Sequence, residues 1–226
     1  HFSVRSIYIT SPYIPKIPSL LISLFRNMRR SDVVYIWFGD TWALCGTFIA
    51  KLLGKRSIIV AGGYDVANEP SIGYGLLSRP LMRFVPLIAF GACDRIIAVS
   101  EFIAKEARRL VKGPDKVMVV YNGLNHSLFR DTGQERNTCT TVGNVTPSAY
   151  RVKGIDSFLK VVDNSPNEHF TLVGRTDLGI EVEKRANLDL SDYKVGEDLV
   201  EVLNRSKYYL QLSVREGFGL AVAEAM

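Results

Sequence analysis

The chain has 226 residues, 47% of them hydrophobic and 23% charged, values typical of a folded globular protein and not of a disordered one. Its net charge of +5 is modest, and no long basic tract with interleaved aromatic residues occurs, so we expect no nucleic-acid binding. The three cysteines are far apart and match no metal-site spacing, which predicts buried thiols in a reducing compartment. With no apolar run of membrane-spanning length and no signal peptide recognised, we expect a cytoplasmic protein.

The first half of the chain alternates short apolar runs with segments of helical periodicity. The runs are rich in β-branched residues and continuously apolar, as strands of a parallel sheet are when both of its faces are covered. Helices are predicted over residues 42–55 and 100–113, the second beginning at Ser100 and ending at Gly113. Strands are predicted at residues 33–37, 57–61, 95–100 and 116–121.

A polar, turn-rich segment at residues 122–138 separates this half from a second alternation. The second half is predicted to contain strands at 139–142, 169–174 and 207–213 and helices at 154–164, 196–206 and from 217 onward, whereas residues 181–195 show no clear strand. We therefore predict an α/β protein with two Rossmann-like lobes, residues 1–130 and 131–226. Each lobe contains a parallel sheet, and a ligand cleft is expected between the lobes.

The segment "SVREGFG" joins a predicted strand to a helix. Glycines at such a junction allow a phosphate to approach the backbone N–H groups, although the glycines alone favour a simple tight turn, because short glycine motifs often match by chance. Glu216 precedes the turn, and Glu224 follows eight residues later among small and apolar neighbours. A carboxylate can accept two hydroxyl protons from a diol such as ribose. The alternative for Glu224 is an ordinary exposed helix residue.

The segment "VGNVTPSAYRVKGID" places Arg151 and Lys153 between a glycine turn and a helix. Two cations there could neutralise a diphosphate, with Lys153 as a point charge and Arg151 as a planar fork. Surface charge on a loop is the simpler alternative.

These segments together resemble retaining glycosyltransferases of the GT-B fold, family 4. "REGFGLAVAEAM" looks like the Glu-x7-Glu signature of that family. "IIVAGGYDVA", "RIIAVSEFIAKEA" and "VVYNGLNHSLF" resemble motifs of its first lobe, and "VKGIDSFLKV" and "FTLVG" resemble the start of its donor-binding lobe. Each motif is short, but all occur in the family's order along most of the chain.

The resemblance implies transfer of a sugar from a nucleotide-sugar to an acceptor hydroxyl, with retention at the anomeric carbon and without a metal or other cofactor. Glu216 would contact the transferred sugar without acting as a nucleophile, and Lys153 with Arg151 would stabilise the departing diphosphate. Glu224 would hold the ribose. The remaining residues implied on the donor side are Asn144, Gly217, Phe218, Gly219 and Leu220.

The chain departs from the family pattern at several positions. Asn144 stands where arginine is common, and the turn near residue 62 lacks the histidine found in relatives. Contact of this turn with sugar or acceptor is a hypothesis, and for Asp65 a structural Asx turn is about equally expected. Its residues are Gly62, Gly63, Tyr64 and Asp65. Units that family members have before "RSIYIT" and after "EAM" are absent from this sequence, so we expect a fragment or a chain of reduced activity.

The expected partners are a UDP-, GDP- or ADP-linked sugar and a sugar, lipid or polysaccharide acceptor. A peripheral contact at the inner membrane face is a further hypothesis, because the first lobe is basic and contains aromatics such as Tyr13, Trp37 and Trp42. A core position is the alternative for these aromatics. Three other functions stay open: a nucleotide-sugar epimerase, a sugar phosphorylase, and an inactive nucleotide-binding fragment.

Overall fold

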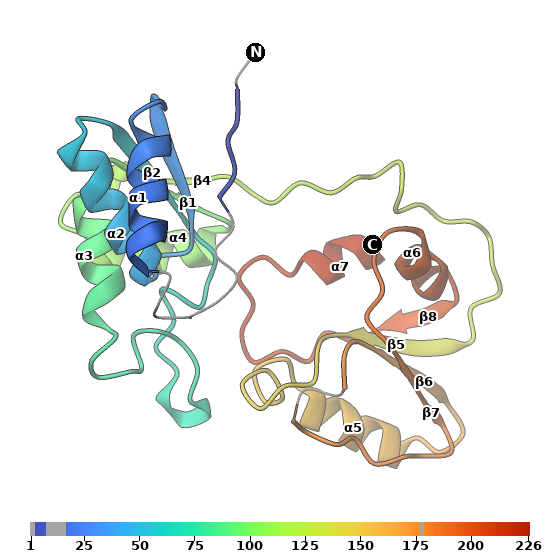
Figure 1. Cartoon of the computed structure of the whole chain (residues 1–226). Helices are drawn as coiled ribbons and strands as arrows, with labels where there is room; N and C mark the ends of the chain where they lie inside the picture. Colours follow the sequence, from blue (N-terminus) through green and yellow to red (C-terminus); the bar gives the residue numbers. More distant parts are fainter. Residues whose placement is uncertain (1–2, 8–16, 177–178) are drawn as a thin grey trace. The chain divides into compact units, whose positions relative to one another are not determined.

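The computed structural model describes residues 3–7, 17–176 and 179–226, and the chain forms two compact units (Figure 1). The first unit comprises His1–Pro70 and Gly75–Tyr121, and the second comprises Ser71–Tyr74 and Asn122–Met226. The lobe boundary after residue 130 stays a prediction. Tyr13 lies outside the described residues.

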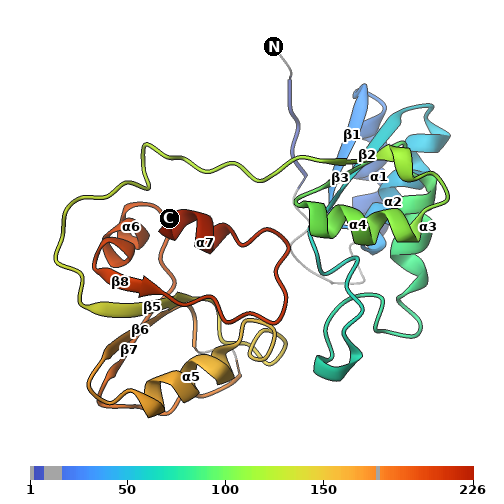
Figure 2. The ribbon, with the colours of Figure 1, turned by 180° about the vertical axis from the view of Figure 1, so that it is seen from behind.

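The first unit contains a four-stranded parallel sheet in the order β1-β2-β3-β4. Its α-helices and strands are α1 (Ile17–Met28), β1 (Val33–Trp37), α2 (Thr41–Leu52), β2 (Arg56–Ala61), α3 (Phe84–Ala92), β3 (Arg95–Ala98), α4 (Glu101–Leu110) and β4 (Val117–Val119). Helices α2 and α4 pack on this sheet, α2 against β1 and β2 and α4 against β3 and β4 (Figures 1 and 2). Ile59 and Ile96 lie opposite one another in register on one face of the sheet and are fully buried, whereas Tyr35 on the other face is 52% exposed. Among the described residues, the cover predicted for both faces of the strands is therefore wrong for β1, which is covered on one face. Ser100 caps α4, as predicted, by accepting a hydrogen bond from the Ile103 N–H.

The second unit also contains a parallel sheet, but its order is β7-β6-β5-β8. Its α-helices and strands are β5 (Thr138–Val142), α5 (Ile155–Asn164), β6 (His169–Val173), β7 (Leu188–Ser191), α6 (Glu197–Asn204), β8 (Ser206–Tyr209) and α7 (Leu220–Ala225). The chain runs outward from β5 to β7 and then returns to the other side of β5 as β8. The strand order therefore reverses between β5 and β8.

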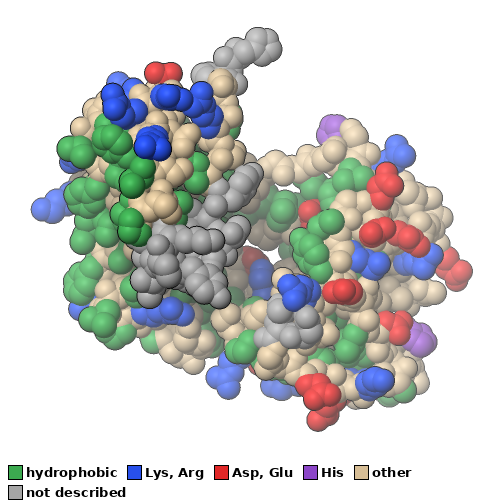
Figure 3. Space-filling model, viewed as in Figure 1, with side chains coloured by type: hydrophobic (Ala, Val, Ile, Leu, Met, Phe, Trp, Pro, Cys, Tyr) green, Lys and Arg blue, Asp and Glu red, His purple; other side chains and the backbone are tan. Residues whose placement is uncertain are grey.

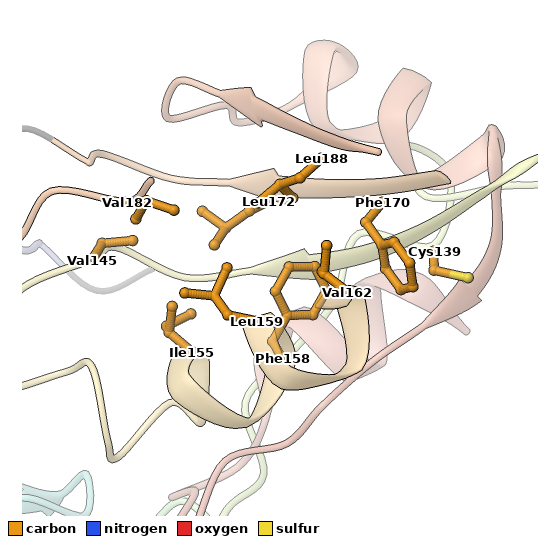
Figure 4. Close-up of a cluster of buried hydrophobic side chains, with 10 residues drawn as sticks. All are labelled: Cys139, Val145, Ile155, Phe158, Leu159, Val162, Phe170, Leu172, Val182 and Leu188. Atoms are coloured by element: carbon orange, nitrogen blue, oxygen red, sulfur yellow. The ribbon is translucent and has the colours of Figure 1, made fainter. Parts of the chain in front are cut away.

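Helix α5 packs its apolar face on this second sheet (Figure 4). Its residues Ile155, Phe158, Leu159 and Val162 are all buried. The rings of Phe158 and Phe170 meet edge to face with centroids 5.8 Å apart. Burying each such side chain contributes about 2–3 kcal/mol to folding, so this cluster fixes the helix that follows Lys153 firmly to the sheet.

Three elements differ from the sequence prediction. Strand β7 lies within residues 181–195, where no clear strand was expected, because "LDLS" is short and alternates apolar and polar side chains. Helices α1 and α3 were also not predicted. The sequence of α3 is apolar on all sides and has a proline in its first turn, a position that a helix tolerates. Among the described residues, no helix is both long enough and apolar enough to cross a bilayer.

Candidate active site

The reversal of strand order directs attention to two loops of the second unit. Ligands of open α/β sheets bind outside the carboxyl ends of the strands at the point where the order reverses. Here these ends are followed by residues 143–154 after β5 and residues 210–219 after β8. Every donor-side residue predicted from the sequence lies in these loops or in α7, which begins at Leu220.

The two loops are held together by backbone contacts. The Val214 N–H donates to the Val152 carbonyl at 2.9 Å. Gly154 has a φ of +67°, and a Cβ at this position would lie 2.0 Å from the carbonyl oxygen of Leu212. Only glycine fits such an approach without displacing backbone. The glycine in "VKGID" therefore allows the loop after β5 to lie against the loop after β8.

This contact brings Lys153 and Glu216 together, 63 residues apart in sequence, with a distance of 2.8 Å from Nζ to Oε1. Their side chains are 38% and 26% exposed, respectively. Both charges can therefore be reached by a ligand while their mutual attraction is only partly screened. Arg151 lies on the same loop and is exposed.

Two further donors to Glu216 were missed by the sequence analysis. Gln211 Nε2 and Ser213 Oγ donate to Glu216 Oε1 at 2.7 and 2.8 Å. The Tyr209 hydroxyl in turn donates to Gln211 Oε1 at 2.8 Å. The sequence shows the alternation of polar residues that puts these side chains on one side of an extended segment, but it does not show that Glu216 is their acceptor.

Glu224 lies on α7 and is half-buried, and this burial raises the pKa of its carboxyl group. Burial also raises the pKa of Tyr209, and the negative charges of Glu216 and Glu224 raise it further. Tyr209 and Glu224 line one pocket of the second unit. Gly219 adopts a φ of +77° at the start of α7, and Gly217, Phe218 and Leu220 complete the turn between Glu216 and this helix.

Asn144 joins the loop after β5 to the loop after β6, because its Oδ1 accepts from the Arg175 N–H at 3.0 Å. The same loops approach closely at Gly174, where a Cβ would lie 2.3 Å from the Gly143 carbonyl oxygen. The side chain of Asn144 thus fixes two loops together.

The turn near residue 62 belongs to the first unit. The carboxylate of Asp65 is 1% exposed, and its two oxygens accept from the N–H groups of Gly39 and Gly63, each at 2.9 Å. Burial raises the pKa of Asp65 although both hydrogen bonds oppose this effect. A Cβ on Gly62 would lie 2.3 Å from the Phe38 ring. Asp65 therefore links two turns, whereas contact of Tyr64 with sugar or acceptor stays a prediction.

No group of three or more His, Cys, Asp or Glu side chains within residues 3–7, 17–176 and 179–226 is placed to hold a metal ion.

Comparison with known proteins decides the family. The family model described as Glycosyltransferase Family 4 matches residues 1–128, more than half of the chain. The chain belongs to glycosyltransferase family 4. The chain is 27% identical over 204 residues to the O-antigen chain mannosyltransferase RfbU of Salmonella typhimurium, a match that covers 85% of this chain and 56% of RfbU.

A second relative is N-acetyl-alpha-D-glucosaminyl L-malate synthase of Bacillus anthracis. It is 22% identical over 241 residues, covering 98% of this chain and 60% of the relative. The chain thus spans 56–60% of the length of these two relatives.

Solved structures confirm the predicted GT-B type of α/β fold with parallel sheets. Anabaena HepE in complex with UDP-glucose superposes with a TM-score of 0.72 at 14% identity, over 91% of this chain and 60% of HepE. Sucrose-phosphate synthase from Thermosynechococcus elongatus gives a TM-score of 0.72 at 15% identity, over 96% and 60% of the respective chains.

Proposed function

We propose that the full-length protein is a glycosyltransferase that moves a sugar from a nucleotide-sugar to an acceptor hydroxyl with retention of anomeric configuration. The observation that supports this most is the Lys153–Glu216 pair, which lies where the order of the second sheet reverses. Family membership favours transfer over the epimerase and phosphorylase alternatives. UDP-linked sugars are the first donors to test, because the similar HepE structure contains UDP-glucose.

In this proposal, the donor diphosphate replaces Glu216 as the partner of Lys153. The bond between the anomeric carbon and the diphosphate oxygen breaks, and its electron pair moves to that oxygen. Lys153, with Arg151 on the same loop, then stabilises the new negative charge, and a fixed cation is most effective where such charge develops. Lys153 is half-buried, so its attraction to the leaving group is stronger than on an open surface.

Glu216 is then free of its cation and faces the transferred sugar, while Glu224 holds the ribose hydroxyls. The acceptor hydroxyl attacks the anomeric carbon from the side that the diphosphate leaves, and its proton passes to the departing phosphate oxygen. Such front-face displacement retains configuration without a covalent enzyme intermediate. Glu216 Oε1 accepts three hydrogen bonds in the free protein, an environment that reduces its strength as a nucleophile.

A donor screen with the full-length protein tests this proposal. UDP-, GDP- and ADP-hexoses are supplied with a sugar, lipid or polysaccharide acceptor, and release of nucleoside diphosphate and the anomeric configuration of the product are measured. We expect one donor class to be consumed, with a retained configuration and without added metal. An inverted product would contradict the retaining mechanism, and no turnover of any donor would contradict the transferase assignment.

We also propose that the protein is cytoplasmic and that its first unit contacts the anionic lipids of the inner membrane face. Exposed apolar side chains occur on α2, on α3 and just before α3: Phe48, Leu52, Leu81, Phe84 and Ile88. Figure 3 shows hydrophobic side chains gathered on the helical side of this unit, with lysines and arginines beside them. Residues 41–56 and 79–93 contain five lysines and arginines and no acidic residue. An apolar surface next to basic groups matches a bilayer with anionic headgroups.

The aromatics first considered for this contact differ in exposure. Trp37 is 53% exposed, whereas Trp42 packs against the core between α1 and α2. Cosedimentation of the full-length protein with anionic and neutral vesicles tests the contact. We expect binding to anionic vesicles that is lost in a variant combining Leu81→Ser and Phe84→Ser. If this variant and the wild type sediment equally with anionic vesicles, the exposed side chains around α3 do not form the membrane contact.

A further inference from the structure

We propose that Tyr209, Gln211 and Ser213 are positioning residues that hold Glu216 in place when Lys153 turns to the donor. This inference rests on the proposed function and adds three residues to the site. None of them belongs to the Glu-x7-Glu segment, and all three lie in the extended chain that leads from β8 to Glu216.

The four side chains form one continuous set of hydrogen bonds. Tyr209 OH lies 2.8 Å from Gln211 Oε1, and Gln211 Nε2 lies 2.5 Å from Ser213 Oγ. Gln211 Nε2 and Ser213 Oγ both reach Glu216 Oε1, at 2.7 and 2.8 Å. All of these contacts are half-buried, so they are less exposed to competing water than surface contacts are.

The direction of every bond in this set follows from simple chemistry. An ionised carboxylate can only accept hydrogen bonds, so the nitrogen of the Gln211 amide must face Glu216. The amide oxygen then faces Tyr209, and the phenol must donate to it. Burial and the charges of Glu216 and Glu224 raise the pKa of Tyr209, so its hydroxyl keeps the proton that this direction requires. Tyr209 therefore prevents the Gln211 amide from flipping.

The hydrogen-bond set explains how Glu216 stays oriented after Lys153 has left it in the proposed reaction. Lys153 supplies the charged one of the three contacts to Glu216 Oε1, and donor binding removes it. Without other donors the carboxylate would be free to rotate, and misplacement of a group at a reacting centre reduces the rate strongly. Gln211 and Ser213 are neutral donors that do not compete for a diphosphate. They keep Glu216 oriented in the donor complex.

The decisive variant is Gln211→Glu in the full-length protein. It keeps the side-chain shape but replaces the amide, which donates through its NH2, with a second carboxylate, which cannot donate. Loss of a hydrogen bond to a charged group typically costs about 1.5–3 kcal/mol, so kcat should fall about 10- to 100-fold with the Kd for nucleoside diphosphate unchanged. Tyr209→Phe leaves the amide free to flip and should reduce kcat less. Gln211→Asn keeps the amide but should lower kcat as much as Gln211→Glu does, since its shorter side chain cannot bridge Tyr209 and Glu216.

Two matched controls make the same chemical changes elsewhere in the second unit. Gln134→Glu alters the chain's other glutamine, which bonds to exposed Arg205. Tyr208→Phe alters a neighbouring tyrosine that is 56% exposed. Both should leave kcat and nucleotide affinity unchanged. The proposal is overturned if Gln211→Glu retains the wild-type kcat, or if it lowers nucleotide affinity and thermal stability as much as kcat, since that would indicate a structural role.

A readout without turnover separates this proposal from the function on which it rests. In ¹⁵N-labelled protein, the two amide protons of Gln211 should be inequivalent and slow to exchange with solvent. They should become fast-exchanging in Tyr209→Phe and Glu216→Ala but not in Tyr208→Phe. If the wild type consumes no donor, the proposed function fails, and slow exchange still supports the hydrogen-bond set. Fast exchange in the wild type would overturn the set whether or not sugar is transferred.

Discussion

Two carboxylates, Asp65 in the first unit and Glu216 in the second, are held in different ways. Asp65 is 1% exposed and accepts from two backbone N–H groups. Glu216 is 26% exposed and accepts from three side chains, one of them a lysine. Backbone donors cannot leave unless the turn itself unfolds, whereas side-chain donors can exchange for a ligand. The comparison supports a structural role for Asp65 and is consistent with the chemical role that we propose for Glu216.

The sharpest test of this comparison is Glu216→Gln. The amide keeps the shape but loses the charge that faces the sugar, and removing one such electrostatic contact typically costs about 10²–10³ in kcat. Because the side chain is partly exposed, we expect the melting temperature to stay close to that of the wild type. Turnover assays of the full-length protein measure kcat, and thermal melts measure the melting temperature. A large loss of stability with unchanged turnover would reverse the roles of the two carboxylates.

Lys153→Met tests whether the Lys153 side chain, which is paired with Glu216 in the free protein, binds the donor diphosphate. The methionine keeps most of the apolar stem and removes the charge that would meet the diphosphate. We expect kcat/KM to fall about 10- to 100-fold, in line with a hydrogen bond to a charged group, and binding of nucleoside diphosphate to weaken as well. Calorimetric titration measures the affinity. Unchanged affinity would show that the diphosphate binds away from Lys153.

Gly154→Ala tests whether the approach of the two loops is what joins Lys153 to Glu216. The methyl group would meet the Leu212 carbonyl oxygen at 2.0 Å, so we expect a loss of stability above the roughly 1–2 kcal/mol that a left-handed φ alone costs. Gly133→Ala is the matched control, with a φ of +70° and no atom within 4 Å of the added Cβ. Urea unfolding of both variants measures the difference. Equal losses would mean that the close approach contributes nothing.

Asp65→Asn should reduce stability by about 1–3 kcal/mol, because one backbone N–H would then face an amide NH2 and remain unsatisfied. The effect should depend on pH. Burial raises the pKa of Asp65 in the folded state, so its contribution is fully present below the ordinary aspartate pKa of about 3.9 and is lost as the pH rises through the folded pKa. The stability gap between wild type and variant should therefore narrow with rising pH, as urea unfolding across the acidic range can measure. A difference in stability that widens with rising pH would contradict a raised pKa of Asp65 in the folded state.

Much of this fold follows from the sequence, because continuous apolar runs and helical stripes such as that of α5 depend on local pattern. Lys153 and Glu216 were also proposed as site residues in this way, each from its own glycine-containing turn. The contact between them was not predictable, since it depends on how Gly154 meets Leu212 across the sheet. Gln211 and Ser213 were missed for the same reason: polar residues at the end of a strand acquire a role only when their acceptor is placed. For Asp65 the sequence left two readings open, and burial favours the structural one.

A crystal structure of the full-length protein with its nucleotide-sugar, or with the nucleoside diphosphate product, tests the central claim most directly. The account predicts a diphosphate oxygen at about 2.8 Å from Lys153 Nζ, the usual length of a charge-assisted hydrogen bond, with Glu216 still held by Gln211 and Ser213. A diphosphate bound elsewhere, with Lys153 still paired to Glu216, would contradict it.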